Sequence, residues 1–306
     1  MPVATLRSIL DHALQQHYAV GYFEAWDLYS LEAVIETAQE QRSPAILGFG
    51  AAVTNGAWLN AGGVEELASV ARGLAERATV PTAVLFNEAQ THEQAMRGLA
   101  AGCNCVMLDS SRLNLLDNIA ATLRLVAAAH AAGAEVEAEL GHLPTAGDPS
   151  DQAGKETDPD EAAAFAQGTG IDALAVAIGN VHLLSNGQAA LDLDRLQRIH
   201  HAVALPLVLH GGTGLPPTAI KPAIARGVAK INYGTRLKQV FLAGVQAGLA
   251  GITEARNVHT VIGSRDETDA MLQGKLRMKQ LIGNLIQFYG SAGRAPAVAA
   301  LKTAGA

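Results

Sequence analysis

The amino-acid sequence predicts an α/β fold, a (β/α)8 TIM barrel with an N-terminal helix and a C-terminal helical extension. Short runs of Val, Ile, Leu and Ala are apolar on both faces, as the buried strands of a parallel sheet are. Each run is followed by an amphipathic segment of helical period. Eight such pairs in 306 residues fit this barrel, which commonly uses ~250 residues. We therefore expect residues 1–306 to form a single barrel domain.

The predicted strands follow one another at regular spacing along the chain. They cover residues 20–23, 45–49, 82–86, 103–108, 135–140, 173–178, 207–210 and 229–233. A doubly wound sheet would have fewer strands and a Gly-rich turn after the first one. The residues after the first strand are Glu-Ala-Trp, so the barrel is favoured.

The predicted helices between these strands cover residues 31–39, 64–75, 93–101, 116–132, 160–168, 193–202, 219–227 and 237–249. Residues 3–17 predict a helix before the first strand, which we expect to cover the N-terminal mouth of the barrel. Residues 267–289 predict one further helix. The irregular segment 141–159 is rich in Gly, Pro and Asp and follows the fifth strand, so we interpret it as a mobile lid.

Composition argues against several classes of protein. Charged residues interrupt every apolar stretch before it reaches the ~18 residues of a membrane span, and the N-terminal residues do not resemble a signal peptide. The net charge of −7, without a basic block, argues against nucleic acid or an anionic membrane as partner. Cys103 and Cys105 lie in one predicted strand, and we expect buried thiols in a cytoplasmic protein.

Candidate reactive side chains stand at the ends of the predicted strands, where barrel enzymes carry their chemistry. In chain order they are Asn87, Glu88, Asp109, Glu139, His182 and His210. The barrel brings the two histidines face to face, with the carboxylates converging on them. This pattern is typical of a metal site, although it leaves the third ligand open.

Two turns after the seventh and eighth strands predict a phosphate site. Barrels commonly bind phosphate there, through backbone N–H groups, a hydroxyl and a helix N-terminus. The residues that we assign to this site are Gly179, Gly211, Gly212, Thr213, Asn232, Gly234 and Thr235.

With these residues assembled, the chain resembles the class II, metal-dependent ketose-bisphosphate aldolases, and most closely their tagatose-bisphosphate branch. The similarity is densest in residues 136–141, 157–159, 173–181, 206–214 and 230–238. It implies a barrel enzyme that cleaves a phosphorylated ketose to dihydroxyacetone phosphate and an aldehyde. It also implies that His182 and His210 bind zinc or another divalent metal, that Asp109 and Glu139 serve a second metal position, and that a monovalent cation binds nearby. A homodimer or homotetramer is expected from the same resemblance.

The chain departs from that family at three positions. The family has Asp-His at the end of strand three, where this chain has Asn87 and Glu88. Glu88 is able to replace the histidine as third ligand, since two histidines and a glutamate form a known catalytic zinc set. Asn87 cannot carry the proton that the family's aspartate carries, so Asp109, Glu139, Asp148 or a bound water would have to do so.

The other two departures lie beside the substrate. The glutamate that the family has in its lid has no counterpart in residues 142–148, and Leu183 stands where the family has Gly against the phosphate. Arg294 resembles an arginine that binds the distal phosphate, although a solvated arginine fits the sequence equally. These changes indicate metal-assisted enediolate chemistry on a substrate other than fructose bisphosphate.

Three functions are consistent with this sequence. The first is a divalent-metal-dependent aldolase-type lyase, with Glu88, His182 and His210 as metal ligands and Asn87, Asp109 and Glu139 as catalytic residues. The second is an epimerase or isomerase that uses the same enediolate. The third is a non-catalytic subunit that binds a sugar phosphate.

Overall fold

The strands form a closed barrel. In the computed structural model, which describes residues 3–149, 154–250, 252 and 257–304, parallel strands pair in chain order and β8 pairs with β1. They are β1 (Val20–Phe23), β2 (Ala45–Gly50), β3 (Thr82–Ala89), β4 (Cys105–Leu108), β5 (Glu135–Leu140), β6 (Ala173–Val176), β7 (Leu207–Leu209) and β8 (Val228–Tyr233). The predicted (β/α)8 TIM barrel is confirmed.

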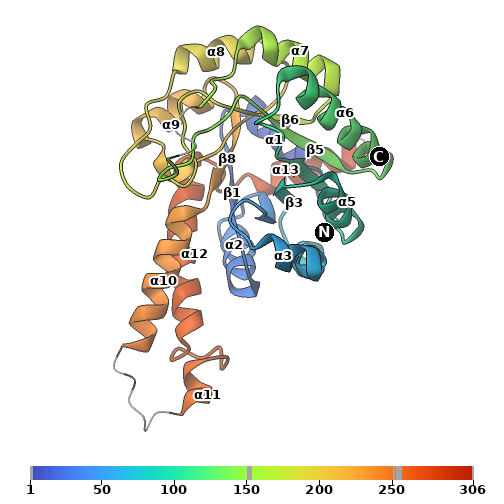
Figure 1. The fold of residues 1–306 in the computed structure, drawn as a ribbon. Coiled ribbons are helices and arrows are strands. Elements are labelled where there is room, and N and C mark those ends of the chain that lie inside the picture. Colours follow the sequence, from blue (N-terminus) through green and yellow to red (C-terminus); the bar gives the residue numbers. More distant parts are fainter. Residues whose placement is uncertain (1–2, 150–153, 251, 253–256, 305–306) are drawn as a thin grey trace.

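Helices alternate with the strands and surround the barrel (Figure 1). They are α2 (Leu28–Glu40), α4 (Val64–Arg77), α5 (His92–Ala100), α6 (Leu115–Ala131), α7 (Pro159–Thr169), α8 (Leu193–Ala202), α9 (Pro217–Ile224) and α10 (Thr235–Leu249). A short helix α3 (Gly56–Trp58) and a π-helical turn η1 (Leu59–Gly63) precede α4, and a 3-10 turn η2 (Gly212–Gly214) follows β7. Several helices begin at a polar cap: the side chains of Asp27, Thr91 and Asn114 accept hydrogen bonds from the first turn of α2, α5 and α6.

The N-terminal helix closes one end of the barrel, as predicted. Helix α1 (Leu6–Gln15) buries Leu6, Ile9 and Leu10 in one cluster with inward-facing side chains of the strands. The strand residues of this cluster are Val20, Tyr22, Ile46, Ala83, Leu85, Cys105, Ala173, Ala175, Val208 and Ala229. Packing one helix against this inner layer leaves the opposite, C-terminal end of the barrel for the reactive side chains.

The boundaries of two strands differ from the predicted ones near the site. Strand β3 continues to Ala89, so Asn87 and Glu88 belong to the strand itself. Strand β4 begins at Cys105, and the prediction that Cys103 lies in it is wrong, because the Cys103 N–H bonds to Gly98 O in the preceding turn. Both cysteines are nevertheless buried free thiols.

Strands β6 and β7 end earlier than predicted because a side chain replaces the strand ladder. Asn180 Oδ1 accepts a hydrogen bond from Ile178 N at 2.9 Å, and its Nδ2 donates to His210 O at 3.1 Å. Asn180 is 1% exposed. This buried amide links the two loops that carry the histidines and so determines their separation.

The C-terminal extension consists of more than the single predicted helix. Helices α10 and α12 (Ala270–Tyr289) form an arm that projects from the barrel, with α11 (Val258–Val261) near its tip (Figure 1). Glycines allow the two helices to approach closely, since a Cβ on Gly244 would lie 2.5 Å from Gln273 O. Helix α12 returns to pack on α2, where Lys275 Nζ lies 2.8 Å from Glu32 and 2.6 Å from Glu36. A last helix, α13 (Ala295–Ala304), follows.

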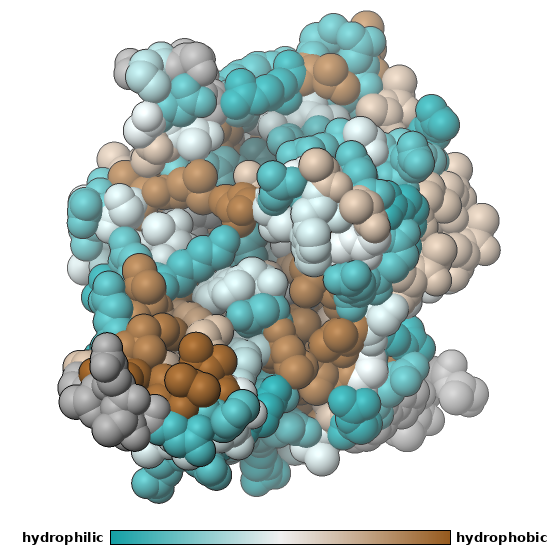
Figure 2. Space-filling model, turned by 60° about the horizontal axis from the view of Figure 1, so that its bottom comes forward, coloured by the Kyte–Doolittle hydropathy of each residue, from teal (hydrophilic) through white to brown (hydrophobic). Residues whose placement is uncertain are grey.

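The arm carries apolar side chains into solvent. Figure 2 shows hydrophobic surface gathered around its tip and in a second patch nearby. The exposed apolar side chains of the arm include Leu242, Leu249, Ile252, Val258 and Ile262. Within the described residues, no helix has the length and apolar character that crossing a bilayer requires.

Candidate active site

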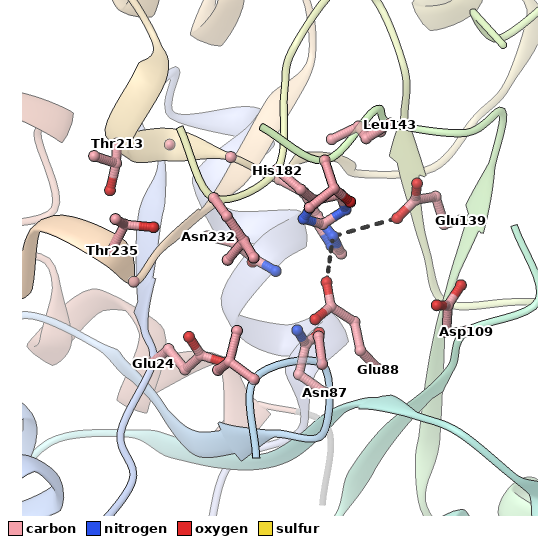
Figure 3. Close-up of a pocket in the computed structure, with 18 of the residues that line it drawn as sticks. Glu24, Asn87, Glu88, Asp109, Glu139, Leu143, His182, Thr213, Asn232 and Thr235 are labelled. Carbon is pink, nitrogen blue, oxygen red and sulfur yellow. Dashed lines mark ion pairs between the residues drawn. The ribbon is translucent and has the colours of Figure 1, made fainter. Parts of the chain in front are cut away.

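A cavity opens at the C-terminal ends of the strands, on the end of the barrel opposite α1 (Figure 3). Most of the residues predicted from the sequence line it. These are Asn87, Glu88, Asp109, Glu139, His182, His210, Gly211, Gly212, Thr213, Asn232, Gly234 and Thr235. Gly179 does not line the cavity: a Cβ at this position would lie 2.1 Å from Ala190 O, so this glycine serves a close backbone approach.

The three predicted metal ligands form one cluster. Ligand atoms of Glu88, His182 and His210 all lie within 4.8 Å of one another. The His210 side chain is 1% exposed and that of Glu88 is 10% exposed. Glu88 reaches this place with a positive φ of 54°, a conformation that costs a β-carbon residue free energy and is often found at functional sites.

Glu137 orients the imidazole ring of His210 from the side opposite the cavity. Its Nε2 lies 3.0 Å from Oε1 of Glu137, and its Nδ1 lies 3.1 Å from Glu88 and 3.3 Å from Glu139. Donation of the Nε2 proton to Glu137 leaves the Nδ1 lone pair facing the other two carboxylates. Metal-binding histidines are commonly held in this way by a carboxylate. Among the described residues Nδ1 of His210 and Oε1 of Glu139 have no hydrogen-bond partner although they are buried, so the donor set fits a divalent cation.

Glu137 and Lys230 are part of the site although the sequence reading missed them. Both side chains are 0% exposed, and Lys230 Nζ donates to Glu137 Oε1 at 2.9 Å and to Asn232 Oδ1 at 2.6 Å. This buried pair joins the back of His210 to the predicted phosphate residue Asn232. The signal that would have revealed them was the run of alternating glutamates in β5 and the lysine in β8, since charged residues are rarely buried without a partner.

The buried charges of the cluster change one another's protonation. Burial alone would raise the pKa of Glu88, but His210, His182 and Lys230 lower it to about 2. Burial raises the pKa of Glu139 to about 8, with Asp109 and Glu88 adding to the effect against the opposing His210. Burial lowers the pKa of His210, yet Glu137, Glu88 and Glu139 together raise it to about 10. The carboxylates therefore stabilise positive charge at the position that a metal would take.

Asn87 and Asp109 occupy different environments at the rim of this cluster. Asn87 is 2% exposed, and its Oδ1 has no hydrogen-bond partner within the described part of the chain. Asp109 is exposed to solvent and accepts a hydrogen bond from Ser111 Oγ at 2.8 Å. Asn87 is thus placed to bind a ligand group, whereas Asp109 is already partnered at the entrance.

The two predicted phosphate turns lie side by side. The backbone N–H of Arg236, in the first turn of α10, donates to Thr213 Oγ1 at 3.2 Å and joins the turn after β7 to the helix N-terminus after β8. Gly211 adopts a φ of 71°, and a Cβ on it would lie 2.2 Å from Val181 O. Thr235 is the first residue of α10, and Gly234 holds the cap position without a side-chain cap. Free N–H groups at such a helix start attract anions.

The predicted lid is attached to the site through backbone hydrogen bonds. His142 and Lys155 pair as an antiparallel bridge, and Thr145 forms a parallel bridge with His182. His142, Leu143 and Thr145 line the cavity, whereas Asp148 does not. Residues 150–153 of this segment lie outside the described residues.

Leu183 stands at the mouth of the cavity in a left-handed conformation, with a φ of 55° and 42% of its surface exposed. This backbone favours glycine, so the leucine is retained at a cost. Arg294, in contrast, lies far from the site. Its guanidinium is 5.3 Å from the ring of Tyr18, which belongs to the cluster around α1 at the other end of the barrel. The suggestion that Arg294 binds a distal phosphate in its own barrel is therefore wrong.

Comparison with known proteins agrees with this geometry. Residues 4–294 match the family model described as fructose-bisphosphate aldolase class-II. A fructose-bisphosphate aldolase of Geobacillus stearothermophilus is 34% identical over 96% of this chain and 99% of its own length. The crystal structure of the YdjI aldolase from Escherichia coli K12 superposes with a TM-score of 0.79 at 31% identity, over 96% of this chain and 99% of that one. A putative fructose-1,6-bisphosphate aldolase from Coccidioides immitis gives 0.81 at 26% identity, over 97% and 100% of the two chains.

Proposed function

Because the chain belongs to the class-II fructose-bisphosphate aldolase family, we propose that it cleaves a phosphorylated ketose or sugar-acid derivative other than fructose 1,6-bisphosphate, with a divalent metal at Glu88, His182 and His210. The activity itself, that of an aldolase-type lyase on a phosphorylated sugar in carbohydrate metabolism, follows from the family. The observation that carries the metal assignment is the buried donor cluster within 4.8 Å at the strand ends. The His₂Glu donor set suits zinc first.

The residues of the chain divide the work around that cluster. Glu88, His182 and His210 would hold a divalent cation, which would supply Lewis acidity toward the oxygens of the substrate. Glu137 holds His210 in one tautomer, and Lys230 holds Glu137. Asn87 orients the hydroxyl at the bond that breaks, and its buried, unpartnered Oδ1 supports this role. Glu139, whose pKa is raised to about 8 mainly by burial, exchanges the proton at the enediolate carbon.

The glycine turns are proposed to bind the phosphate of the substrate. The cavity is lined on this side by residues of both turns, Gly211, Gly212 and Thr213 after β7 and Gly234 and Thr235 after β8. The start of α10 adds free N–H groups. Leu183 narrows the entrance beside them. A bulky residue here supports a substrate whose shape differs from that of fructose 1,6-bisphosphate.

The replacement of a histidine by Glu88 supports the same conclusion about substrate. A glutamate lowers the charge of the metal cluster by one relative to three neutral histidines. A cation held by this set would polarise a carbonyl less strongly than one held by three histidines. A substrate whose carbonyl is more electron-poor, as in a sugar acid with a nearby carboxyl group, would offset this weaker polarisation.

A retro-aldol assay over a substrate panel tests the proposal. The metal-depleted chain is loaded with zinc, manganese or iron(II) and offered ketose 1-phosphates, ketose 1,6-bisphosphates and phosphorylated sugar acids. We expect metal-dependent release of dihydroxyacetone phosphate from at least one of the non-fructose substrates, faster than from fructose 1,6-bisphosphate. A metal-loaded chain that cleaves none of them contradicts the proposal. Deuterium incorporation from solvent without cleavage would indicate an epimerase or isomerase instead.

We also propose a homo-oligomer, a dimer or tetramer, in the cytoplasm. A groove lined by Trp26, Phe241, Leu242 and Val245 lies between α10 and the loop after β2, and Val53 belongs to both this groove and the catalytic cavity. The apolar side chains of the arm supply matching surface for a second copy. Sedimentation of the full chain, with Leu242→Asp as the disrupting variant, tests the assembly. The buried free thiols are the state that a reducing compartment maintains.

A further inference from the structure

Proton transfer at the breaking bond is the step for which the site has no assigned residue. Asn87 stands at the end of β3, and its carboxamide cannot exchange a proton at neutral pH. Another group in the cavity has to carry this proton. Among the described residues, the carboxylates that line the cavity are those of Glu24, Glu88, Asp109 and Glu139.

Three of these four carboxylates are already engaged. Glu88 lies 3.1 Å from Nδ1 of His210 and belongs to the metal cluster. Glu139, 3.3 Å from the same atom, is already assigned the proton at the enediolate carbon. Asp109 is exposed at the entrance and bonded to Ser111. Glu24 is therefore the one carboxylate of these four without an assigned role, and nothing in the sequence pattern singles it out.

Glu24 follows β1 directly and is held in place by its surroundings. Its N–H donates to Tyr233 O at 3.1 Å. A Cβ on Gly50 would lie 2.3 Å from Glu24 Oε1, and a Cβ on Gly234 would lie 2.6 Å from Oε2. The carboxylate therefore fills a space between the end of β2 and the turn after β8 that only glycines leave open.

This position places the carboxylate beside Gly50, the strand partner of Asn87. Gly50 pairs with Asn87 across the β2–β3 ladder, and neighbouring strands are ~4.8 Å apart. A Cβ on Gly50 would lie 2.3 Å from Glu24 Oε1 and 3.8 Å from Asn87 O, so the carboxylate and Asn87 flank the same glycine. In Figure 3, Glu24 and Asn87 both lie on the side of the cavity away from His182, with another side chain between them in this view.

The surroundings of Glu24 also favour a group that exchanges protons. Among the described residues no hydrogen-bond donor reaches its carboxylate. Burial and the charge of Glu88 raise its pKa, Lys238 and His210 oppose them, and the result is about 7. A carboxyl that changes protonation near neutral pH suits general acid–base catalysis.

We propose that Glu24 is the acid–base residue for the hydroxyl at the bond being broken, acting beside Asn87 in place of a carboxylate at position 87. The assignment rests on the proposed retro-aldol function. In the cleavage direction Glu24 removes the hydroxyl proton, the O–H electron pair becomes the C=O bond of the aldehyde, and the C–C electron pair stays on the ketose fragment as an enediolate. In condensation, protonated Glu24 returns the proton to the alkoxide. Asn87 Nδ2 donates a hydrogen bond to the same oxygen.

The test separates this proton from the one at the enediolate carbon. Glu24→Gln is compared with wild type for cleavage of a sugar that wild type cleaves, and for deuterium exchange into dihydroxyacetone phosphate in D₂O. Exchange needs no carrier at the breaking bond. We expect kcat for cleavage to fall by ~10²–10⁴, while KM and the exchange rate stay within about threefold. Retained exchange also shows that the variant is folded.

Two further variants accompany Glu24→Gln: one adds a carboxylate at position 87 to restore activity, and the other removes a carboxylate far from the site as a control. Asn87→Asp introduced into Glu24→Gln should restore kcat by at least about tenfold, since it returns a proton carrier to the same hydroxyl. The matched control is Glu93→Gln, an exposed glutamate in the first turn of α5, which should match wild type in both assays.

Several outcomes overturn the assignment. Cleavage by Glu24→Gln within about threefold of wild type shows that Glu24 carries no essential proton. A loss expressed only in KM assigns Glu24 to substrate binding, and equal loss of cleavage and exchange assigns it to holding the site together. Failure of Asn87→Asp to rescue counts against it as well. A wild-type chain that cleaves no sugar of the panel overturns the proposed function and this assignment together.

Discussion

The two walls of the cavity differ in how closely they follow the family. The wall built by β5 to β8 carries His182, His210 and the phosphate turns in the expected pattern, with the buried pair Glu137–Lys230 behind His210. Its departures from the family are Leu183 and the lid residues 142–148. The wall built by β1 to β3 carries Glu24, Asn87 and Glu88, where a proton carrier and a histidine would be expected. In the proposed function the first wall supplies the phosphate site and two of the three metal ligands, His182 and His210. The second wall supplies the third ligand, Glu88, and the residues proposed to act at the breaking bond.

Buried charge on the first wall makes substitutions there costly to the stability of the fold. Glu137 and Lys230 are both 0% exposed, so each needs the other. Replacing Lys230 by Met should lower the free energy of unfolding by ~3–5 kcal/mol, because it removes the buried ammonium that balances the charge of Glu137. Urea denaturation measures this loss. The double variant Lys230→Met/Glu137→Met should recover much of it, and an equal loss in single and double variants would contradict the pairing.

His210 tests whether the first wall holds the metal. His210→Ala removes a donor that Glu137 orients, and metal affinity should fall by more than the ~10–100-fold typical of losing an outer partner. Metal content after gel filtration and competition with a chelator measure it. His201→Ala, an exposed histidine of α8, is the control and should bind as wild type does. Equal metal content in both variants would place the ion elsewhere.

Glu88 tests the charge argument on the second wall. Glu88→His gives a neutral ligand and removes one negative charge, so the donor ketone should become more acidic by about one pKa unit. Because proton-transfer rates follow only part of such a change, exchange should speed up by at most about tenfold. Deuterium exchange into dihydroxyacetone phosphate, in metal-loaded protein, reports this step directly. A slower exchange with full metal content would mean that the glutamate itself takes part in proton transfer.

Leu183 gives the smallest expected effect. Leu183→Gly relieves a residue at a φ of 55°, which costs roughly 1–2 kcal/mol, although the flexible glycine offsets part of the gain. The wider entrance should lower KM for bisphosphorylated ketoses by a few-fold while kcat changes little. Steady-state kinetics with two ketose bisphosphates would detect it. An unchanged KM would show that the leucine does not limit access.

The barrel was predictable because its signal is local and repeated. Each strand is a short apolar run followed by an amphipathic segment, so errors at single boundaries, such as that at Cys103, leave the order unchanged. The ends of β6 and β7 were predicted less well. There the backbone groups of Ile178 and His210 bond to the side chain of Asn180, and the apolar pattern of the sequence does not reveal such a bond. The sequence predicted one helix after α10, whereas the structure has an arm of α10 and α12 with α11 near its tip. The two long helices pack on each other through glycines, a contact between distant residues that the local sequence does not show.

By itself the sequence determined the barrel, the metal-binding residue types and the departures at Asn87, Glu88 and Leu183, since these depend on residue identity and on the period of the apolar pattern. Only the tertiary structure decided that Glu137 and Lys230 stand behind His210 and that Arg294 lies at the other end of the barrel. It also placed the Glu24 carboxylate beside Gly50, the strand partner of Asn87. These relations join residues far apart in the chain. Their consequences come from burial and distance, which raise or lower a pKa only once the charges have been brought together.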